Sequence, residues 1–372
     1  MKNPKVADIV GIINKIAPVG LAEAWDNPGL QVGDPAAEVS RVMVALDPAP
    51  DVIDSALKAS CQLLVTHHPL IFKPLKSIST ANPHGATIQK ALKGGLSIVS
   101  MHTNYDIASG GLNDLLAGKI GLSSCVPLKV TNTSELVKLI VFVPAEQLEQ
   151  LRSVLLPFAA AQGNYRDCSF AADGVGTFTP LDGAEPFAGT INMLAEVHEK
   201  RLELLLQRTQ LPRAIKVLLA AHPYEEPAFD VYPLHNDGEK LGIGRVGLLP
   251  EPLTLAEYAA QLRKSLSAPV LRYVGEPTTK VSKVALCSGS GASLLREAAR
   301  LGADVLVTGD IKYHDARDAE DMGLTLIDAG HFPTEIIMVD EITGRLRQAL
   351  TVAGYTGCHV EACRAETDPF RI

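Results

Sequence analysis

Short apolar runs rich in β-branched residues alternate with amphipathic segments in the first and last thirds of this 372-residue chain. In the first third, VSRVMVALD, CQLLVTHHP and LSIVSMHTNYD are typical of buried strands, and helical patterns separate them. Strands that are separated by helices imply βαβ crossovers and a largely parallel sheet. The same alternation returns from VSKVALC onward. We therefore expect an α/β core built from two βα halves.

The middle of the chain interrupts this alternation after a polar, turn-rich stretch, CVPLKVTNTSE. The segments that follow predict, in order, a strand, a helix, a Gly- and Pro-rich hairpin region, a strand, a helix and a strand. This β-α-β-β-α-β order is the split βαβ plan of ferredoxin-like domains. We predict that residues 129–247 form an inserted domain, and that residues 1–128 and 248–372 form the two halves of the core.

The composition argues against several classes of protein. A net charge of −8 without any basic run argues against dedicated nucleic-acid binding, since neutralising phosphates requires clustered Lys and Arg. The N-terminal apolar stretch is too short for a signal peptide, and no run reaches the roughly 20 apolar residues of a membrane span. Six scattered cysteines without a CxxC pair are typical of reduced thiols. We expect a cytoplasmic protein that acts neither on membranes nor on nucleic acid.

Three strands of the predicted core end in residues that can bind metal, in VTHHP, SMHTNYD and IDAGHFPTE. In an open α/β sheet, ligands gather beyond the carboxyl ends of the strands, so segments far apart in sequence can converge there. Successive side chains of a strand point to opposite sides. His67 and His68 would therefore suit two ions better than one.

His331 and Glu335 are four residues apart, which places them on one face if both lie in a helix. Pro333 fits the first turn of that helix, so whether His331 lies inside it or just before it stays open. Glu335 could bridge two cations with its two oxygens, and Asp106 supplies another oxygen ligand. Together with the strand-end histidines this is a mixed nitrogen and oxygen set, compatible with zinc, manganese or iron.

Each of these residues, taken alone, also fits a structural role. A strand-end histidine is often a hydrogen-bonded structural residue, a His-x-x-x-Glu pair often lies on a helix surface, and His102 could simply cap a turn. The spacing therefore leaves both interpretations open. The involvement of three strand ends is what favours the metal site.

Two further core motifs follow strands. CSGSGAS, at Cys287–Ser293, could hold a phosphate on its backbone amides. It lacks the Lys of a P-loop and the full dinucleotide fingerprint, so a tight β-to-α turn is favoured. In TGDIKYHDA, Asp310, Tyr313 and His314 could line the same cleft as the histidines, or Asp310 could only cap the next helix. In the insert, AHPYEEPAFD favours a structural or contact role over a second metal site for His222, Glu225 and Glu226.

Several of these segments together resemble a known family. AWDNPGLQVGD, THHPLIF, HTNYDIASGGLND, LCSGSGAS, TGDIKYHDA and LIDAGHFPTE, in that order, resemble the NIF-three-like family, also labelled GTP cyclohydrolase I type 2 homologues. HPYEEPAFDVYPL is similar to the insert of longer bacterial members, which is related to PII and CutA-type trimeric domains. Ser288 replaces a glycine common in the family, a change expected to matter little.

The resemblance implies a three-layer α/β core with a dinuclear metal centre. It also implies a hexameric toroid, a trimer of dimers, whose metal sites face an interior cavity. Carried over position by position, His68 and Asp106 would hold one divalent metal ion, and His67 and His331 would hold the other. Glu335 would bridge both ions.

A dimetal centre can lower the pKa of a bridging water and polarise the bond that is attacked. Opening a guanine imidazole ring or hydrolysing a phosphoester could both use such a centre. His102 and His314 are candidate proton shuttles or phosphate contacts. We therefore expect a metal-dependent hydrolase of GTP cyclohydrolase type that acts on a nucleotide or similar small molecule. The alternative is a metal-binding regulatory or scaffold ring protein, with the insert as a sensor or partner module.

Overall fold

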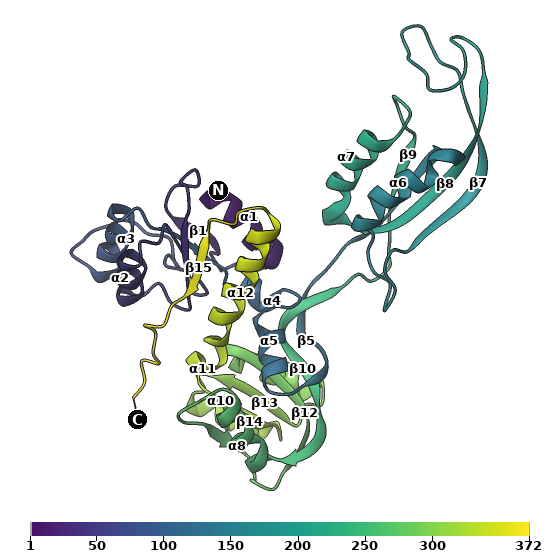
Figure 1. Cartoon of the computed structure of the whole chain (residues 1–372). Helices are drawn as coiled ribbons and strands as arrows, with labels where there is room; N and C mark the ends of the chain where they lie inside the picture. The colour runs from purple at the N-terminus through teal and green to yellow at the C-terminus, as the bar shows by residue number, and fades with distance from the viewer. Residues whose placement is uncertain (1, 372) are drawn as a thin grey trace. The chain divides into compact units, whose positions relative to one another are not determined.

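The computed structural model describes residues 2–371, and the chain divides into two compact units (Figure 1). The core unit consists of Met1–Asn132 and Leu241–Ile372, and the inserted unit consists of Thr133–Lys240. The predicted boundaries, after residues 128 and 247, both fall inside long strands, β5 (Ser123–Thr133) and β10 (Lys240–Thr254). The amino-acid composition of a continuous strand does not change where the strand passes from one unit to the other, so the sequence does not mark the boundary there.

The first sheet of the core unit has five strands in the order β1-β4-β3-β2-β15. Neighbours β15, β2, β3 and β4 pair in parallel, and β1 is antiparallel to β4. Helices α1 and α12 pack on one face, and α2 and α3 pack on the other. Burial of both faces explains the continuous apolar runs. The bounds are β1 (Gly29–Val32), β2 (Arg41–Ala45), β3 (Leu63–Thr66), β4 (Ser97–Ser100), β15 (His359–Ala362), α1 (Val6–Ile16), α2 (Pro50–Lys58), α3 (Pro83–Lys93) and α12 (Ile337–Val352).

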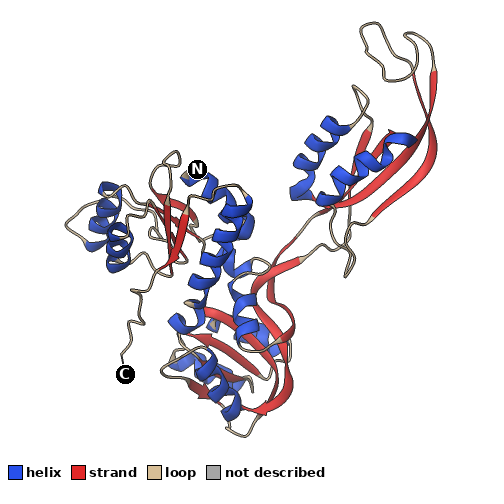
Figure 2. Ribbon diagram, in the orientation of Figure 1, coloured by secondary structure: helices blue, strands red, loops and turns tan. Residues whose placement is uncertain are grey.

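The second sheet of the core unit has six strands in the order β11-β14-β13-β12-β10-β5. Strands β12, β13 and β14 are parallel, and β10 and β11 pair antiparallel to them. Helices α5 and α8 pack on one face, and α9 and α10 pack on the other. The architecture is therefore a mixed α/β one (Figure 2). The bounds are β11 (Arg272–Val274), β12 (Lys280–Ser290), β13 (Val305–Gly309), β14 (Thr325–Asp328), α5 (Leu112–Lys119), α8 (Leu255–Ser265), α9 (Leu295–Arg300) and α10 (Tyr313–Asp321).

The inserted unit contains one antiparallel sheet in the order β7-β8-β6-β9. Alternate residues in the second half of β8 are buried, and the side chains of Leu202, Leu204 and Leu206 pack against helices α6 and α7. One face of this sheet is thus covered by helices. The bounds are β6 (Leu136–Pro144), α6 (Leu148–Leu155), β7 (Ser169–Phe178), β8 (Ala195–Gln207), α7 (Leu211–Ala221) and β9 (Phe229–Pro233).

Among the described residues, no helix is long and apolar enough to cross a membrane. All six cysteines are free thiols.

Candidate metal centre

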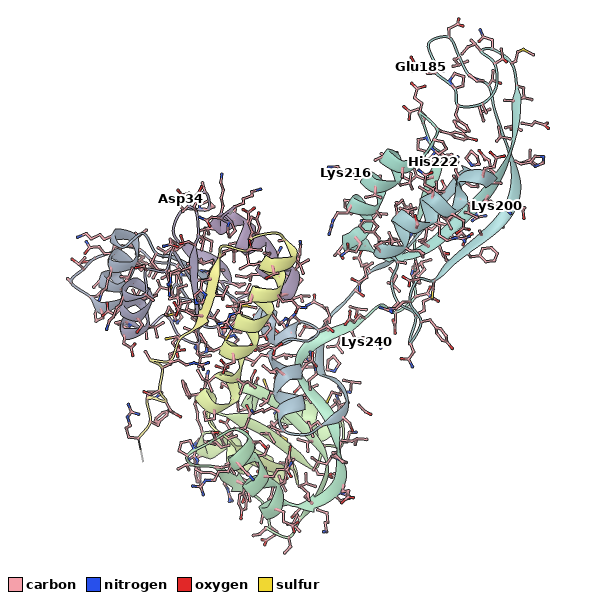
Figure 3. The ribbon with its side chains drawn as sticks, viewed as in Figure 1. Asp34, Glu185, Lys200, Lys216, His222 and Lys240 are labelled. Atoms are coloured by element: carbon pink, nitrogen blue, oxygen red, sulfur yellow. The ribbon has the colours of Figure 1, made fainter. Side chains whose placement is uncertain are left out.

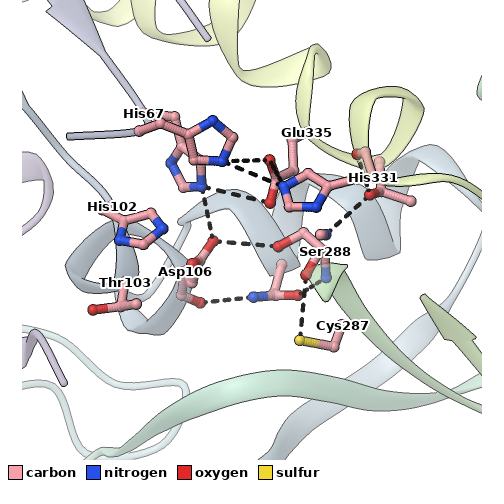
Figure 4. A network of polar contacts seen from close by, with 12 residues as sticks. His67, His102, Thr103, Asp106, Cys287, Ser288, His331 and Glu335 are labelled. Carbon is pink, nitrogen blue, oxygen red and sulfur yellow. Dashed lines mark hydrogen bonds and ion pairs between the residues drawn. The ribbon is translucent and has the colours of Figure 1, made fainter. Parts of the chain in front are cut away.

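The five predicted ligands converge at the carboxyl ends of three strands. His67 and His68 follow β3, and Asp106 lies in the short helix α4 (Thr103–Ile107) that follows β4. His331 and Glu335 are the first and last residues of α11 (His331–Glu335), which follows β14. His331 therefore lies inside the helix, which answers the question that Pro333 left open. Figure 4 shows Glu335 and Asp106 beside the histidine rings.

The carboxylate of Glu335 faces histidines with both of its oxygens. Oε1 lies 3.7 Å from Nε2 of His67, and Oε2 lies 3.1 Å from Nε2 of His68 and 2.9 Å from Nε2 of His331. The Nε2 atoms of His68 and His331 are 3.3 Å apart. Oδ1 of Asp106 is 3.8 Å from Nε2 of His67. These contacts group His67 with Asp106, and His68 with His331.

This grouping differs from the pairing that the family resemblance implied, in which His68 went with Asp106 and His67 with His331. The reason lies in the alternation of side chains along the chain. The ring of His67 turns towards the end of β4, where its Nδ1 donates to the carbonyl oxygen of Met101 at 2.9 Å, and Asp106 follows the same strand. The ring of His68 turns towards the end of β2, where its Nδ1 donates to Asp47 at 2.7 Å.

The donor atoms fit a metal better than they fit one another. Nε2 of His67 and Oε2 of Glu335 are buried and make no hydrogen bond with the described residues, although histidine nitrogens approach the carboxylate. Buried polar atoms without a partner are rare and require an explanation. The ligand atoms of His68, His331 and Glu335 lie within 4.8 Å of one another, and so do those of His67, His68 and His102. These groups could hold a metal ion.

Each histidine of the cluster is oriented by an acceptor at its Nδ1, which leaves Nε2 directed at the centre. Such outer contacts fix the tautomer and the ring orientation of metal-binding histidines. The pairs are His67 with the Met101 carbonyl (2.9 Å), His68 with Asp47 (2.7 Å), His102 with Asp26 (2.8 Å) and His331 with Asp310 (2.7 Å). Asp310 was predicted to line this cleft. The roles of Asp26 and Asp47 escaped the sequence reasoning, although Asp47 follows β2 much as the histidines follow β3.

The charges in the cluster move the pKa values of its members. Burial lowers the pKa of His68, but the hydrogen bond to Asp47 and the negative charge of Glu335 outweigh it and raise the value to about 10. Burial likewise opposes charge on His331, yet Glu335 and Asp310 raise its pKa to about 9. Burial raises the pKa of Glu335, but the neighbouring histidines bring it well below its usual range. In the metal-free protein, the rings of His68 and His331 are therefore protonated at neutral pH.

Of the two predicted proton shuttles, the structure brings only His102 to the cluster. Its ring centroid lies 5.1 Å from that of His67 and 5.6 Å from that of His68. It stands before α4, but its side chain makes no capping hydrogen bond. His314 is exposed on α10, where its ring packs edge-on against Tyr313, and it does not line the cavity described below.

The CSGSGAS motif makes room for the centre instead of presenting free amides. The amide of Gly289 donates to the hydroxyl of Thr334 at 3.0 Å. The hydroxyl of Ser288 donates to Oδ1 of Asp106 at 3.2 Å, so the departure from the family glycine does reach the cluster. Gly289 has a φ of +60°, and a methyl group on it would lie 2.1 Å from Oε1 of Glu335. The expected tight turn thus shapes the space around Glu335.

Gly289→Ala is accordingly expected to displace Glu335 and to lower the metal content of the protein. Gly302→Ala is the matched control, because Gly302 has a similar φ of +67° but open space at the Cβ position. Both variants should lose about 1 kcal/mol of stability through the left-handed backbone. Elemental analysis should show a metal deficit only in Gly289→Ala, and equal metal in both variants would contradict the crowding argument.

Asp310→Asn tests the orienting contacts. Asparagine tolerates the φ of +57° at this position, so the backbone should be preserved. Losing the carboxylate that accepts from His331 should weaken metal binding about 10- to 100-fold. A competition titration with a chelator measures this effect, and Asp318→Asn on the exposed side of α10 serves as the control. Equal metal affinities in the two variants would show that Asp310 does not contribute to metal binding.

The histidine cluster borders a cavity of about 620 Å³, a volume typical of small-molecule sites. His68 and His331 line it together with the apolar rings of Phe332 and Phe370. Arg272 also lines it and pairs with Asp328. The other acidic lining residues are Asp47, Asp310 and Asp368.

In the inserted unit, the AHPYEEPAFD motif is engaged in local contacts. His222, which follows α7 (Figure 3), donates from Nε2 to the Phe142 carbonyl at 2.9 Å and accepts at Nδ1 from the amide of Tyr224 at 3.1 Å. Glu225 accepts from the amide of Glu185 at 2.9 Å. These contacts occupy both nitrogens of the histidine, which suits a structural role.

The sequence profile of the family Duf34/NIF3 (NGG1p interacting factor 3) matches residues 4–369. The chain belongs to the Duf34/NIF3 family. Two relatives named GTP cyclohydrolase 1 type 2 homolog are 40% identical (Halalkalibacterium halodurans, 100% of this chain and 99% of the relative) and 39% identical (Bacillus subtilis, 97% of each).

Solved structures of Duf34/NIF3 relatives have the same fold over the whole chain. A Bacillus cereus protein related to NIF3 superposes with a TM-score of 0.92 at 38% identity, covering 100% of both chains. A Staphylococcus aureus protein gives a TM-score of 0.74 at 31% identity, covering 100% of this chain and 99% of its own. The expected family and its α/β fold are thereby confirmed.

Proposed function

We propose that this chain is a dinuclear metal-dependent hydrolase of GTP cyclohydrolase type that acts on a nucleotide or a similar small molecule. The observation that carries the proposal is the carboxylate of Glu335, one oxygen of which faces His67 and the other His68 and His331. The names of the Duf34/NIF3 relatives agree with this class of reaction. The neighbouring cavity has room for such a substrate.

In this proposal His67 and Asp106 hold one divalent ion, His68 and His331 hold the other, and Glu335 bridges them. The mixed donor set is compatible with zinc, iron or manganese. Such a pair of ions, when bound, supplies Lewis acidity and lowers the pKa of a water molecule. The carboxylates of Asp47 and Asp310 keep two of the rings in position.

His102 is the residue of this chain that is best placed to move a proton. Asp26 accepts from its Nδ1 at 2.8 Å, and this leaves Nε2 free to exchange a proton with a substrate or water at the cluster. The pKa of Asp26 is brought to about 2, because burial is outweighed by its hydrogen bonds to His102 and Thr103. Asp26 therefore stays a carboxylate that can stabilise charge on the ring. A role for His314 stays a prediction, and its exposure gives it no added support.

The test is turnover of GTP and of a panel of nucleotides and phosphoesters by metal-loaded protein. His102→Asn should keep both ions and lose about 100-fold or more in turnover. His314→Asn tests the other predicted proton shuttle under the same conditions, and unchanged turnover would remove that role. Elemental analysis must accompany each assay. If the protein with two ions per chain turned over no member of the panel, the hydrolase proposal would fail.

A second candidate is a metal-binding regulatory or scaffold ring, and a cavity in the inserted unit favours it. This cavity of about 700 Å³ lies between β7, β8 and the segment after α7. The strand order β7-β8-β6-β9 supports a ferredoxin-like insert of PII or CutA type. The ring would be a homohexamer, a trimer of dimers, in the cytoplasm, where free cysteines are usual. Identical partners recovered with and without the insert would count against this function.

A further inference from the structure

Two exposed aromatic rings stand beside the metal centre without a packing partner that explains them. Trp25 is 58% exposed and Phe72 is 44% exposed. Their ring centroids are 5.7 Å apart and their planes are inclined by 57°. We refer to this exposed pair, Trp25 and Phe72, as the corner. Large apolar side chains in such positions gain little from folding and commonly mark a binding surface.

The corner is joined to the centre through His102. The His102 ring lies edge-on to Trp25 at 6.0 Å and to Phe72 at 6.2 Å between centroids. The centroid of the same imidazole lies 5.1 Å from that of His67. A flat group resting on the aromatic pair would thus lie next to the residue that we assign to proton transfer.

Hydrogen bonds hold both rings in place. Asp26, the residue after Trp25, accepts from the amide of Thr103 at 3.0 Å and from His102. Asn27 donates to the carbonyl of Ile71, the residue before Phe72, at 2.7 Å. The two loops are therefore tied to α4 and to each other. Such anchoring is expected of a preformed site and is unnecessary for a loosely exposed surface loop.

We propose that Trp25 and Phe72 form a stacking subsite for the base of a nucleotide or nucleoside ligand. This inference rests on the proposed function, because it names the substrate class of the same centre. Every base has a π-face, and stacking on an aromatic side chain contributes affinity for any base without hydrogen-bond readout. The cavity beside His68 and His331 leaves space for the remainder of the ligand.

The chain offers a direct probe, since Trp25 is its single tryptophan. Guanosine added to metal-free and to metal-loaded protein should quench the tryptophan emission in a saturable manner. Ribose 5-phosphate, which has the phosphate but no base, should leave the emission unchanged. Free N-acetyltryptophanamide corrects for absorption by the nucleoside.

The matched variants are Phe72→Leu and Phe170→Leu. Phe72→Leu keeps the fluorescent Trp25 and removes the second aromatic ring of the subsite, so it should weaken guanosine binding about 10-fold. Phe170 is similarly exposed, at 59%, but lies on β7 in the inserted unit, and its replacement should leave binding unchanged. Equal affinity in the two variants, or equal responses to guanosine and ribose 5-phosphate, would overturn the proposal. A tryptophan emission that shifts with protein concentration alone would also overturn it, by showing that another copy covers the pair.

The outcomes separate this inference from the hydrolase proposal. Binding of guanosine without turnover of any substrate would support the stacking subsite and contradict the hydrolase proposal. Turnover by Phe72→Leu with an unchanged KM would support the hydrolase proposal and contradict the stacking subsite.

Discussion

Glu335→Gln is expected to remove both metal ions from the protein. A glutamine amide keeps the shape of the side chain but offers one neutral oxygen in place of two charged ones. Because Oε1 faces His67 and Oε2 faces His68 and His331, both groups of donors lose a ligand together. Affinity at each should fall by more than about 100-fold, since even an outer-shell change costs 10- to 100-fold. Elemental analysis of purified protein measures the content.

Two companion variants sharpen this result. Asp106→Asn should remove one ion only, because Asp106 contacts His67 and no other histidine of the cluster among the described residues. Glu276→Gln, in an exposed turn of the same unit, should leave the content unchanged. Two ions per chain in Glu335→Gln would disprove the bridging role. Loss of both ions in Asp106→Asn would disprove the grouping of His67 with Asp106 and of His68 with His331.

Metal uptake is expected to release protons and to tighten steeply with rising pH. In the metal-free protein the pKa of His68 is raised to about 10 and that of His331 to about 9, so both rings carry a proton at neutral pH. A cation must displace these protons. The apparent affinity should therefore rise about tenfold per pH unit for each proton displaced, until the pH passes the pKa of that ring.

Calorimetry in buffers of different ionisation enthalpy counts the protons that are released. The expected count at neutral pH approaches two for binding at His68 and His331. His314→Asn is the control, because an exposed histidine away from the cluster should not alter the count. An affinity that stays flat between neutral and alkaline pH would show that the rings are already neutral before metal arrives.

The convergence of His67, His68 and Asp106 was predictable from one sheet, whereas the approach of His331 and the pairing of the ligands were not. His67 and His68 follow β3 and Asp106 follows its parallel neighbour β4, so these residues meet at one edge of the first sheet. His331 follows β14, which belongs to the second sheet. Alternation predicted that His67 and His68 diverge, but it does not reveal which neighbouring element stands on each side. That depends on the order of β2, β3 and β4 in the sheet, a property of the tertiary fold.

The orienting carboxylates show a second limit of sequence reasoning. Asp26 and Asp47 are single acidic residues in loops, and no periodicity separates them from solvated surface charges. Their roles emerge only from contacts across the fold, such as the 76 residues between Asp26 and His102. Ser288 illustrates the same point, because a one-residue departure from the family gains meaning only from its contact with Asp106.

The centre also has a consequence for how the chain is made. Its donors are far apart in the sequence, and His68 and His331 are separated by 263 positions. During synthesis, His67, His68 and Asp106 leave the ribosome long before His331 and Glu335 are made. The inserted unit, Thr133–Lys240, is translated in between. A complete site can therefore form only after Glu335 has been translated, and a cation bound there would hold together two segments of the core unit that are made at different times.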